Sequence, residues 1–368
     1  MPEIEIGSGK SSRRGYGLED VAIVPSRRTR DPEDVDLSWR LEGYTFGLPL
    51  MAAASDAVVS PESAIEIGKA GGLAVLNLEG LWTRYEDPLP LFEEISSLAP
   101  EVSTRRLQEL YSQPIRPELV TARIREIASA GVVTCASLSP QRTVRFGKAV
   151  VEAELDLLVI QGTVVSAEHV STRSEPLNLK RFIREYDIPV IVGGCASYPA
   201  ALHLMRTGAV GVLVGVGTGN ASTTWSVLGL GAPHATAIAD AAGARSRHLE
   251  ETGVYVQVIA DGGMSTGGDI AKAIACGADA VMIGAPLAAV EDAPGKGRYW
   301  DASAAHPTLP RGSLVEIQPR GSLAEVLLGP AHAPDGALNL FGALRTAMAM
   351  CGYASVREFH KAEVTVAG

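Results

Sequence analysis

Residues 255–288 read YVQVIADGGMSTGGDIAKAIACGADAVMIGAPLA and contain one complete period of the pattern that repeats along the chain. The apolar runs at 255–262 and 280–284 are typical of strands that are buried on both faces. Between them, residues 267–277 have the apolar spacing of a helix and end on a glycine suited to a helix C-terminus. A strand, helix and strand in this order join two parallel strands, so the stretch predicts an α/β fold.

The same kind of strand recurs upstream, which brings the number of predicted strands to eight. The six further runs lie at 48–54, 72–77, 132–138, 155–162, 188–194 and 211–215. Further helical patterns separate them at 62–71, 117–131 and 198–208. Eight strands alternating with helices favour closure into a (β/α)₈ TIM barrel over an open sheet.

We expect one barrel domain over residues 1–368, because (β/α)₈ barrels with insertions often exceed 250 residues. Two segments interrupt the plain repeat, at 78–116 and at 291–335. The second is rich in proline and glycine and is predicted to be a loop, or flap, over the barrel mouth. A helical tail is predicted at 340–359.

Composition excludes several classes of protein. The formal net charge is −10, so the chain has no cationic field for nucleic acid. No apolar stretch is long enough for a membrane span, and the N-terminus lacks the apolar core of a signal peptide. The four cysteines form no CxxC pair and suggest neither a zinc site nor a disulfide framework. We therefore expect a cytoplasmic protein.

The turns after the seventh and eighth strands predict an anion site. Gly262, Gly263, Gly284 and Ala285 lie where barrels commonly bind phosphate, and their backbone N–H groups are unhindered. The alternative is that these glycines only make tight turns. Asp261 is expected to point into the mouth and to accept hydrogen bonds from ribose hydroxyls, or else to cap its turn.

Several motifs follow one another in the order found in a known family. The opening motifs are LEDVAIVPSRRTRDPEDVDL (18–37), LPLMAAASDAV (48–58) and GGLAVLN (71–77), and later come VGVGTGNASTT (214–224), the 260–295 stretch and the tail at 340–359. The ADGG and GADAVMIG pair alone also resembles FMN-dependent barrel oxidases. Taken together, the motifs resemble IMP dehydrogenases and GMP reductases over most of the chain. They are most similar to the short, IMP dehydrogenase-related branch without CBS modules.

This resemblance implies a purine nucleoside 5′-monophosphate (IMP, XMP or GMP) as ligand, NAD or NADP as cofactor, no flavin, and a homotetramer or homo-octamer. The family's phosphate and ribose contacts map to Asp261, Gly262, Gly263, Gly284, Ala285 and Asn220. The family's potassium ion is bound by backbone carbonyls that map to Gly217, Gly219 and Ser222.

The chain departs from the family pattern at its chemical centre. Ser222 stands where the family has the cysteine that attacks purine C2, although Thr224 matches a family threonine. A serine hydroxyl is a weak nucleophile without a neighbouring base. Asn220 and Ala285 replace phosphate-binding serines, and the Asp-Ser-Ser run after strand four is Gln-Gly-Thr at 161–163. The family's purine-ring loop is missing and the flap looks shortened, so we expect IMP oxidation to be weak or absent. The alternatives are a non-catalytic nucleotide sensor and, third, a flavin barrel oxidase.

Four other residues merit interpretation. His234 could serve Ser222 as a base, although a structural role is the plainer interpretation. Cys195 follows the fifth strand and is expected to face the mouth, where its alternative role is that of a small buried hydrophobe. Arg298 and Tyr299 resemble the family's flap pair, but we expect a surface pair.

Overall fold

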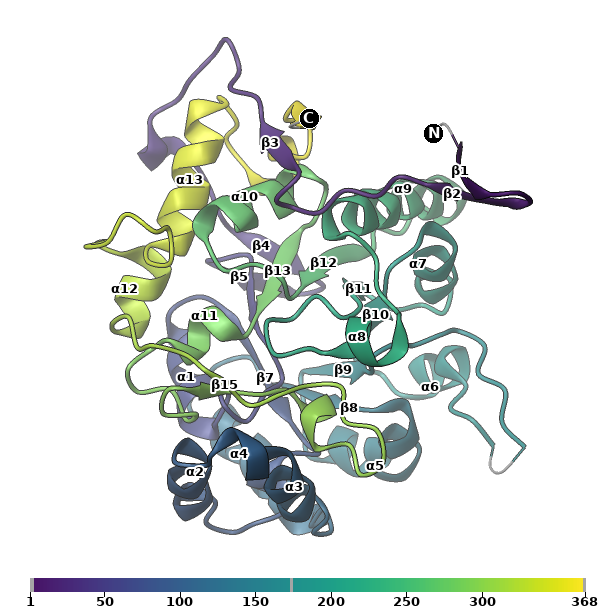
Figure 1. The fold of residues 1–368 in the computed structure, drawn as a ribbon, viewed down its shortest axis with the longest axis vertical. Coiled ribbons are helices and arrows are strands. Elements are labelled where there is room, and N and C mark those ends of the chain that lie inside the picture. Colours follow the sequence, from purple (N-terminus) through teal and green to yellow (C-terminus); the bar gives the residue numbers. More distant parts are fainter. Residues whose placement is uncertain (1–2, 173–174, 367–368) are drawn as a thin grey trace.

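The computed structural model describes residues 3–172 and 175–366, and its centre is a closed barrel of eight parallel strands (Figure 1). All eight predicted strands are present, which confirms the (β/α)₈ fold. Around the barrel their order is β10 (Val190–Cys195), β11 (Gly211–Val214), β12 (Gln257–Asp261), β13 (Ala280–Ile283), β6 (Leu50–Ala52), β7 (Leu73–Asn77), β8 (Cys135–Leu138) and β9 (Leu157–Gln161).

Helices follow the strands and surround the barrel. They are α1 (Pro61–Lys69), α4 (Pro117–Ala128), α5 (Pro140–Glu152), α6 (Leu179–Glu185), α7 (Tyr198–Met205), α8 (Thr224–Leu228), α9 (His234–Thr252), α10 (Gly267–Ala275) and α11 (Ala285–Ala288). Local sequence fixes several helix starts. Ser60 and Thr266 each form a capping box, in which the cap and the third helical residue bond each other's backbone N–H groups.

The two predicted insertions are more ordered than the sequence suggested. Residues 78–116 contain η2 (Leu81–Thr83), α2 (Leu89–Ser96) and α3 (Pro100–Tyr111). The segment 291–335, predicted as a loop, contains β14 (Arg298–Tyr299), η3 (Ala302–Ala305), β15 (Val315–Glu316) and α12 (Leu323–Leu328). Strand β14 pairs with β15 in antiparallel fashion, so the flap has a short sheet of its own.

The N-terminal and C-terminal segments of the chain meet beside α10, where β3 and β16 pair. At the N-terminal end lie β1 (Glu3–Gly7), β2 (Lys10–Arg13), β3 (Val21–Ile23), η1 (Pro32–Asp34), β4 (Trp39–Leu41) and β5 (Tyr44–Phe46). At the C-terminal end lie α13 (Leu340–Met350), α14 (Val356–Phe359) and β16 (Val364–Val366). Strand β16 pairs with β3, while the β1–β2 hairpin projects from the body (Figure 1). No helix in the described part of the chain is long and apolar enough to cross a membrane.

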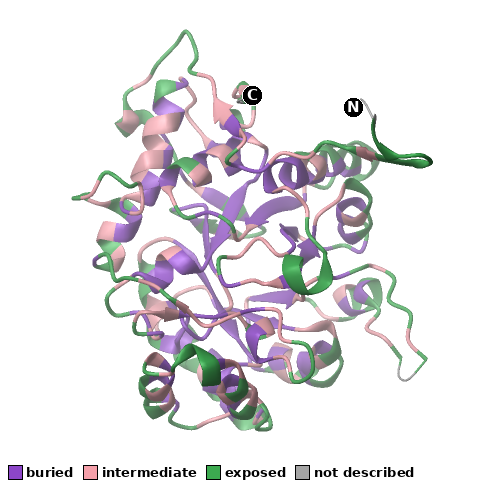
Figure 2. Cartoon of the chain, in the orientation of Figure 1, coloured by how far each residue is buried: buried purple, intermediate pink, exposed green. Residues whose placement is uncertain are grey.

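The core has an inner and an outer part, and both are buried (Figure 2). The outer part lies between strands and helices. The inner part fills the barrel, and Trp39, Leu41 and Phe46 of the β4–β5 hairpin belong to it. The Trp39 indole donates to the Gln257 side chain at 3.0 Å, at the start of β12. The hairpin therefore closes the N-terminal end of the barrel, and the opposite end, the mouth, is where side chains can face a ligand.

Candidate functional site

A ring of polar side chains lies at the mouth. Because side chains alternate along a strand, the inward rows that begin with Leu73, Cys135, Leu157 and Ile259 in the barrel core continue to the strand ends. The residues that end these rows are Asn77 on β7, Ser137 on β8, Gln161 on β9 and Asp261 on β12. The barrel is thus apolar inside and polar at its rim.

Asp261 points into this mouth, where the sequence predicted it. The Gln161 side-chain amide reaches across and donates to Asp261 Oδ2 at 3.3 Å. Burial is the main cause that raises the pKa of Asp261 to about 7, and the nearby Asp301 carboxylate adds to it, while the Gln161 hydrogen bond opposes it. Asp261 can therefore both donate and accept hydrogen bonds near neutral pH.

The predicted anion-binding turns lie on neighbouring strands, because β12 and β13 pair with Asp261 opposite Met282. The Gly262 N–H is already used, since it donates to the Met282 carbonyl at 3.0 Å. The N–H groups of Gly263, Gly284 and Ala285 have no acceptor within the described residues. Three of the four predicted backbone donors are thus free, and Gly262 contributes only its left-handed conformation, with φ of 74°.

The loop after β11 packs closely against the turn after β12. A side chain at Gly263 would place its Cβ 3.1 Å from the Thr218 carbonyl oxygen and 3.4 Å from the His234 ring. The Thr218 hydroxyl donates to the Asp261 carbonyl at 2.6 Å, and Asn220 donates to the Ser265 hydroxyl at 3.2 Å. The fold therefore brings the predicted Asn220 beside the predicted phosphate turn.

Tyr299 of the flap lies against Gly284. The ring and hydroxyl of Tyr299 occupy the space that a side chain at Gly284 would fill. Tyr299 is only 6% exposed, and burial raises the pKa of its hydroxyl above the usual value. The expected surface pair is therefore wrong for Tyr299, while Arg298 is half-buried and donates to the Ser96 carbonyl at 3.1 Å. The only feature of the sequence that could have indicated this position of Tyr299 was the resemblance of Arg298–Tyr299 to the family's flap pair.

Ser222 has no base beside it. Its Oγ lies 3.1 Å from the Thr224 hydroxyl and accepts the Thr224 backbone N–H at 3.3 Å, and these are its side-chain bonds within the described residues. Without a histidine or carboxylate partner the hydroxyl stays un-ionised and weakly nucleophilic. Ser222 and Thr224 are thus adjacent, as the sequence predicted, but they do not form an activated nucleophile.

The flap is joined to the Ser222 loop through the backbone. Ser222 pairs with Gly312 in an antiparallel bridge. On either side of it, the Thr223 N–H donates to the Arg311 carbonyl and the Ser313 N–H donates to the Ala221 carbonyl, both at 2.9 Å. The bridge and the two flanking hydrogen bonds hold the flap over the mouth.

A second attachment joins the flap to the residues that follow β6, the first barrel strand in the sequence. The Ser55 hydroxyl donates to the Trp300 carbonyl at 2.5 Å, and the Trp300 indole donates to the Tyr111 hydroxyl at 2.8 Å. Tyr111 in turn donates to the carboxylate of Asp56. Burial raises the pKa of Asp56 to about 6, because two opposing hydrogen bonds only partly offset desolvation.

His234 has a structural role. Its Nε2 lies 2.9 Å from the Val214 carbonyl, which can only accept, so Nε2 carries the proton. Burial lowers the pKa of His234, so the ring is neutral near pH 7. The ring lines a hollow of about 260 Å³ beside the N-terminal residues Glu19 and Asp20. The geometry agrees with the plainer interpretation of this histidine.

Cys195 does not face the mouth, contrary to expectation. It is 2% exposed and belongs to the outer core, with its Sγ 3.4 Å from the Leu213 carbonyl. The strand carries a register shift between Gly193 and Cys195, which the sequence pattern does not reveal. Burial raises the pKa of the Cys195 thiol to about 12, so it remains a thiol.

The predicted potassium ligands lie in one loop. The Gly219 carbonyl accepts the Ser222 N–H at 2.9 Å, whereas those of Gly217 and Ser222 accept no hydrogen bond from the described residues. Free carbonyl oxygens suit a hard monovalent cation. No group of three or more His, Cys, Asp or Glu side chains suited to a metal occurs among the residues that the structure describes.

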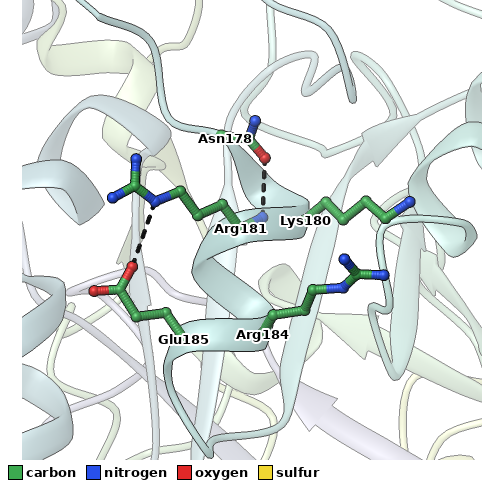
Figure 3. Close-up of a pocket in the computed structure, with 5 residues that line it drawn as sticks. All are labelled: Asn178, Lys180, Arg181, Arg184 and Glu185. Atoms are coloured by element: carbon green, nitrogen blue, oxygen red, sulfur yellow. Dashed lines mark hydrogen bonds and ion pairs between the residues drawn. The ribbon is translucent and has the colours of Figure 1, made fainter.

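A further hollow lies on the outside of the barrel (Figure 3). Its lining side chains, which include Lys180, Arg181 and Arg184, all belong to α6 or to its cap, Asn178. Arg181 is engaged by Glu185 at 3.6 Å. No strand end contributes to this hollow, so it is separate from the mouth.

Comparisons with known proteins agree with this geometry. A family model described as IMP dehydrogenase / GMP reductase domain matches residues 15–322. An uncharacterized oxidoreductase of Mycobacterium tuberculosis is 52% identical over 374 residues, covering 99% of this chain and 100% of that protein. An inosine-5′-monophosphate dehydrogenase of Methanocaldococcus jannaschii is 24% identical, covering 95% and 92%. The crystal structure of an IMP dehydrogenase/GMP reductase-like protein from Corynebacterium glutamicum has a TM-score of 0.95 and 46% identity, covering 99% and 98%.

Proposed function

Because the chain belongs to the IMP dehydrogenase/GMP reductase family of oxidoreductases, we propose that its barrel mouth binds a purine nucleoside 5′-monophosphate such as IMP, XMP or GMP. The observation that carries the proposal is the set of three free backbone N–H groups at Gly263, Gly284 and Ala285, on the rims of two adjacent strands. An anion between these rims satisfies all three donors at once.

The positions of the ribose and the base follow from the phosphate bound at these N–H groups. The Tyr299 hydroxyl lies against Gly284 and adds a fourth donor for the phosphate. Asp261 is one residue from the phosphate turn and accepts hydrogen bonds from the ribose. Asn220, tied to Ser265, borders the same turn. The base then extends from this anchor over the barrel mouth.

NAD or NADP, when bound, supplies the acceptor or donor of a hydride. The residues of this chain give that chemistry little support. Ser222 lacks a base, and Thr163, where the family has a serine, is engaged by the Arg311 guanidinium at 3.2 Å. We propose that IMP oxidation is weak or absent. Potassium, if bound, would be held by the carbonyls of Gly217, Gly219 and Ser222, and the assembly would be a homotetramer or homo-octamer.

The second candidate is a nucleotide sensor that binds without turnover. The specific observation in its favour is that Ser222 is unactivated while three backbone N–H donors for a phosphate are free. Incubation with IMP and NAD, and separately with GMP and NADPH, distinguishes the two by absorbance of the reduced cofactor. Steady NADH production by the unmodified protein would contradict weak catalysis, and a yellow, flavin-containing preparation would favour the barrel oxidases instead.

Binding itself is tested by calorimetry with IMP and with ribose 5-phosphate. Gly263→Ala should weaken both ligands, because φ there is 72° and the new Cβ would lie 3.1 Å from the Thr218 carbonyl. Gly253→Ala is the matched control, since its φ is 74° but its Cβ would meet nothing within 4 Å. If both variants bind like the wild type, or if the wild type binds neither ligand, the phosphate site is refuted.

A further inference from the structure

We infer that Asn77 and Ser137 form a recognition pair for an amide group of the bound ligand, either the N1–H and 6-oxo group of a purine or the carboxamide of nicotinamide. This inference rests on the proposed function, because it concerns the base end of the same nucleotide site. Neither residue belongs to the phosphate turns or to the Ser222 loop.

The orientation of the Asn77 side chain is fixed by its neighbour. Asn77 Oδ1 accepts the backbone N–H of Glu79 at 3.0 Å. Because a backbone N–H can only donate, the oxygen must occupy this position and the NH₂ group must occupy the other. The Nδ2 atom has no hydrogen-bond partner within the described residues, although Asn77 is only 5% exposed.

A buried amide donor without a partner is costly, by about 1–3 kcal/mol for a group of this kind. The loop after β7 nevertheless holds it in place. Glu79 also accepts the Ser139 N–H at 2.6 Å, and its own carbonyl accepts the Arg84 guanidinium at 2.9 Å. Such a fixed, unsatisfied donor at the rim of a barrel is explained if a ligand acceptor completes it.

Ser137 stands directly beside Asn77. The two residues are register partners on the adjacent strands β7 and β8, and both end inward-facing rows. The Ser137 hydroxyl has no side-chain hydrogen bond in the described part of the chain, and the residue is 6% exposed. A free N–H donor therefore lies next to a free hydroxyl that can accept.

This donor and acceptor are complementary to a planar amide. Asn77 Nδ2 would donate to the ligand carbonyl oxygen, while Ser137 Oγ would accept the adjacent ligand N–H. The 6-oxo purines and the nicotinamide carboxamide share this group. A purine without an oxygen at C6 lacks it.

The position of the pair fits a nucleotide whose phosphate is anchored at the end of β13, two strands away around the barrel. Around the barrel, β6 separates β7 from β13, which carries Gly284. Neighbouring strands are about 4.8 Å apart, so the rim distance from Gly284 to Asn77 is roughly 10 Å. Ribose and base together span such a distance when the phosphate is held at Gly284.

The test compares two variants with a matched control by calorimetry. Asn77→Asp keeps the acceptor for the Glu79 N–H but replaces the free donor with an oxygen, and Ser137→Ala removes only a hydroxyl. Ser139→Ala is the control, because that hydroxyl caps α5 and lies outside the inward rows. Folding of each variant is checked by thermal unfolding. The probes are IMP, purine riboside 5′-monophosphate, ribose 5-phosphate and nicotinamide mononucleotide.

We expect Asn77→Asp to weaken IMP roughly tenfold to a hundredfold and Ser137→Ala roughly threefold to tenfold. Ribose 5-phosphate, purine riboside monophosphate and the control variant should change by less than about twofold. The same pattern on nicotinamide mononucleotide, with IMP unaffected, would assign the pair to the carboxamide. IMP and nicotinamide affinities that are insensitive to both variants would overturn the inference and leave the proposed function intact. A wild type that binds none of the probes would overturn both.

Discussion

The titration of Asp261 should make the stability of the folded chain depend on pH. In an unfolded chain this carboxyl ionises near pH 4. In the folded protein its pKa is raised to about 7, chiefly by burial. The folded state therefore binds a proton that the unfolded state has lost, and stability falls as pH rises from about 4 to about 7. Outside this range Asp261 contributes no further pH dependence.

The magnitude follows from the pKa difference. Once Asp261 is ionised in both states, its burial costs the folded protein about 4 kcal/mol, and at pH 5 the cost is about 2 kcal/mol. Asp261→Asn keeps an oxygen that can accept the Gln161 amide but cannot ionise. The variant should be more stable than the wild type, and its advantage should grow from about 2 kcal/mol at pH 5 to about 4 kcal/mol at pH 8.

Urea unfolding at several pH values between 4 and 8 measures this difference. Asp56, whose pKa is raised to about 6, also titrates in this range, but it is present in both proteins and cancels in the comparison. The reasoning would be refuted by a difference between the two proteins that does not change with pH, or by a variant that is less stable at pH 8.

Three further predictions concern packing and reactivity. Gly284→Ala should lower the free energy of unfolding by about 1–3 kcal/mol, because its Cβ would overlap the Tyr299 ring. Adding Tyr299→Leu to this variant should recover part of the loss. Equal stability of the single variant and the wild type in urea would contradict this. Arg245 and Asp279 form a buried ion pair at 2.7 Å, and Asp279 also accepts from the Tyr255 hydroxyl and the Val258 N–H. Arg245→Ala should cost about 3–5 kcal/mol in the same assay, because it leaves the buried Asp279 carboxylate without its positive charge, and a loss below about 1 kcal/mol would contradict this burial. Native protein at pH 7.5 should react slowly with a disulfide reagent, because burial raises the pKa of all four thiols, to about 12 for Cys195 and about 11 for Cys276, as well as for Cys135 and Cys351. One rapid equivalent of reaction would contradict these environments.

Much of the fold could be predicted because its signals are local. The eight strands are continuous apolar runs, and helices such as α10 begin at a capping box that is visible in the sequence. The predicted phosphate turns fall on paired strands for the same reason, since barrel topology follows from strand order. The use of the Gly262 N–H by Met282 was not predictable, because it depends on the register of β12 and β13.

The remaining features depend on contacts that are distant in sequence. Tyr299 packs on Gly284 through the course of the flap, and Cys195 leaves the mouth through a register shift after Gly193. The Asn77 Nδ2 donor is free for two reasons. The Glu79 N–H, two residues away, bonds Oδ1 and so fixes the orientation of the amide, and no acceptor among the described residues lies within reach of Nδ2. No pattern of residue types in the sequence encodes a donor that is left without a partner.

The backbone bridge between Ser222 and Gly312 has a consequence for protein engineering. Exchanging the loop 217–224 alone with that of a relative would leave a foreign loop bonded through its backbone to the resident flap at Arg311 and Ser313. The two segments should therefore be exchanged together, the loop 217–224 with flap residues 311–313. Chimaeras that exchange both segments should keep the geometry of this contact, whereas chimaeras that exchange only the loop should lose it.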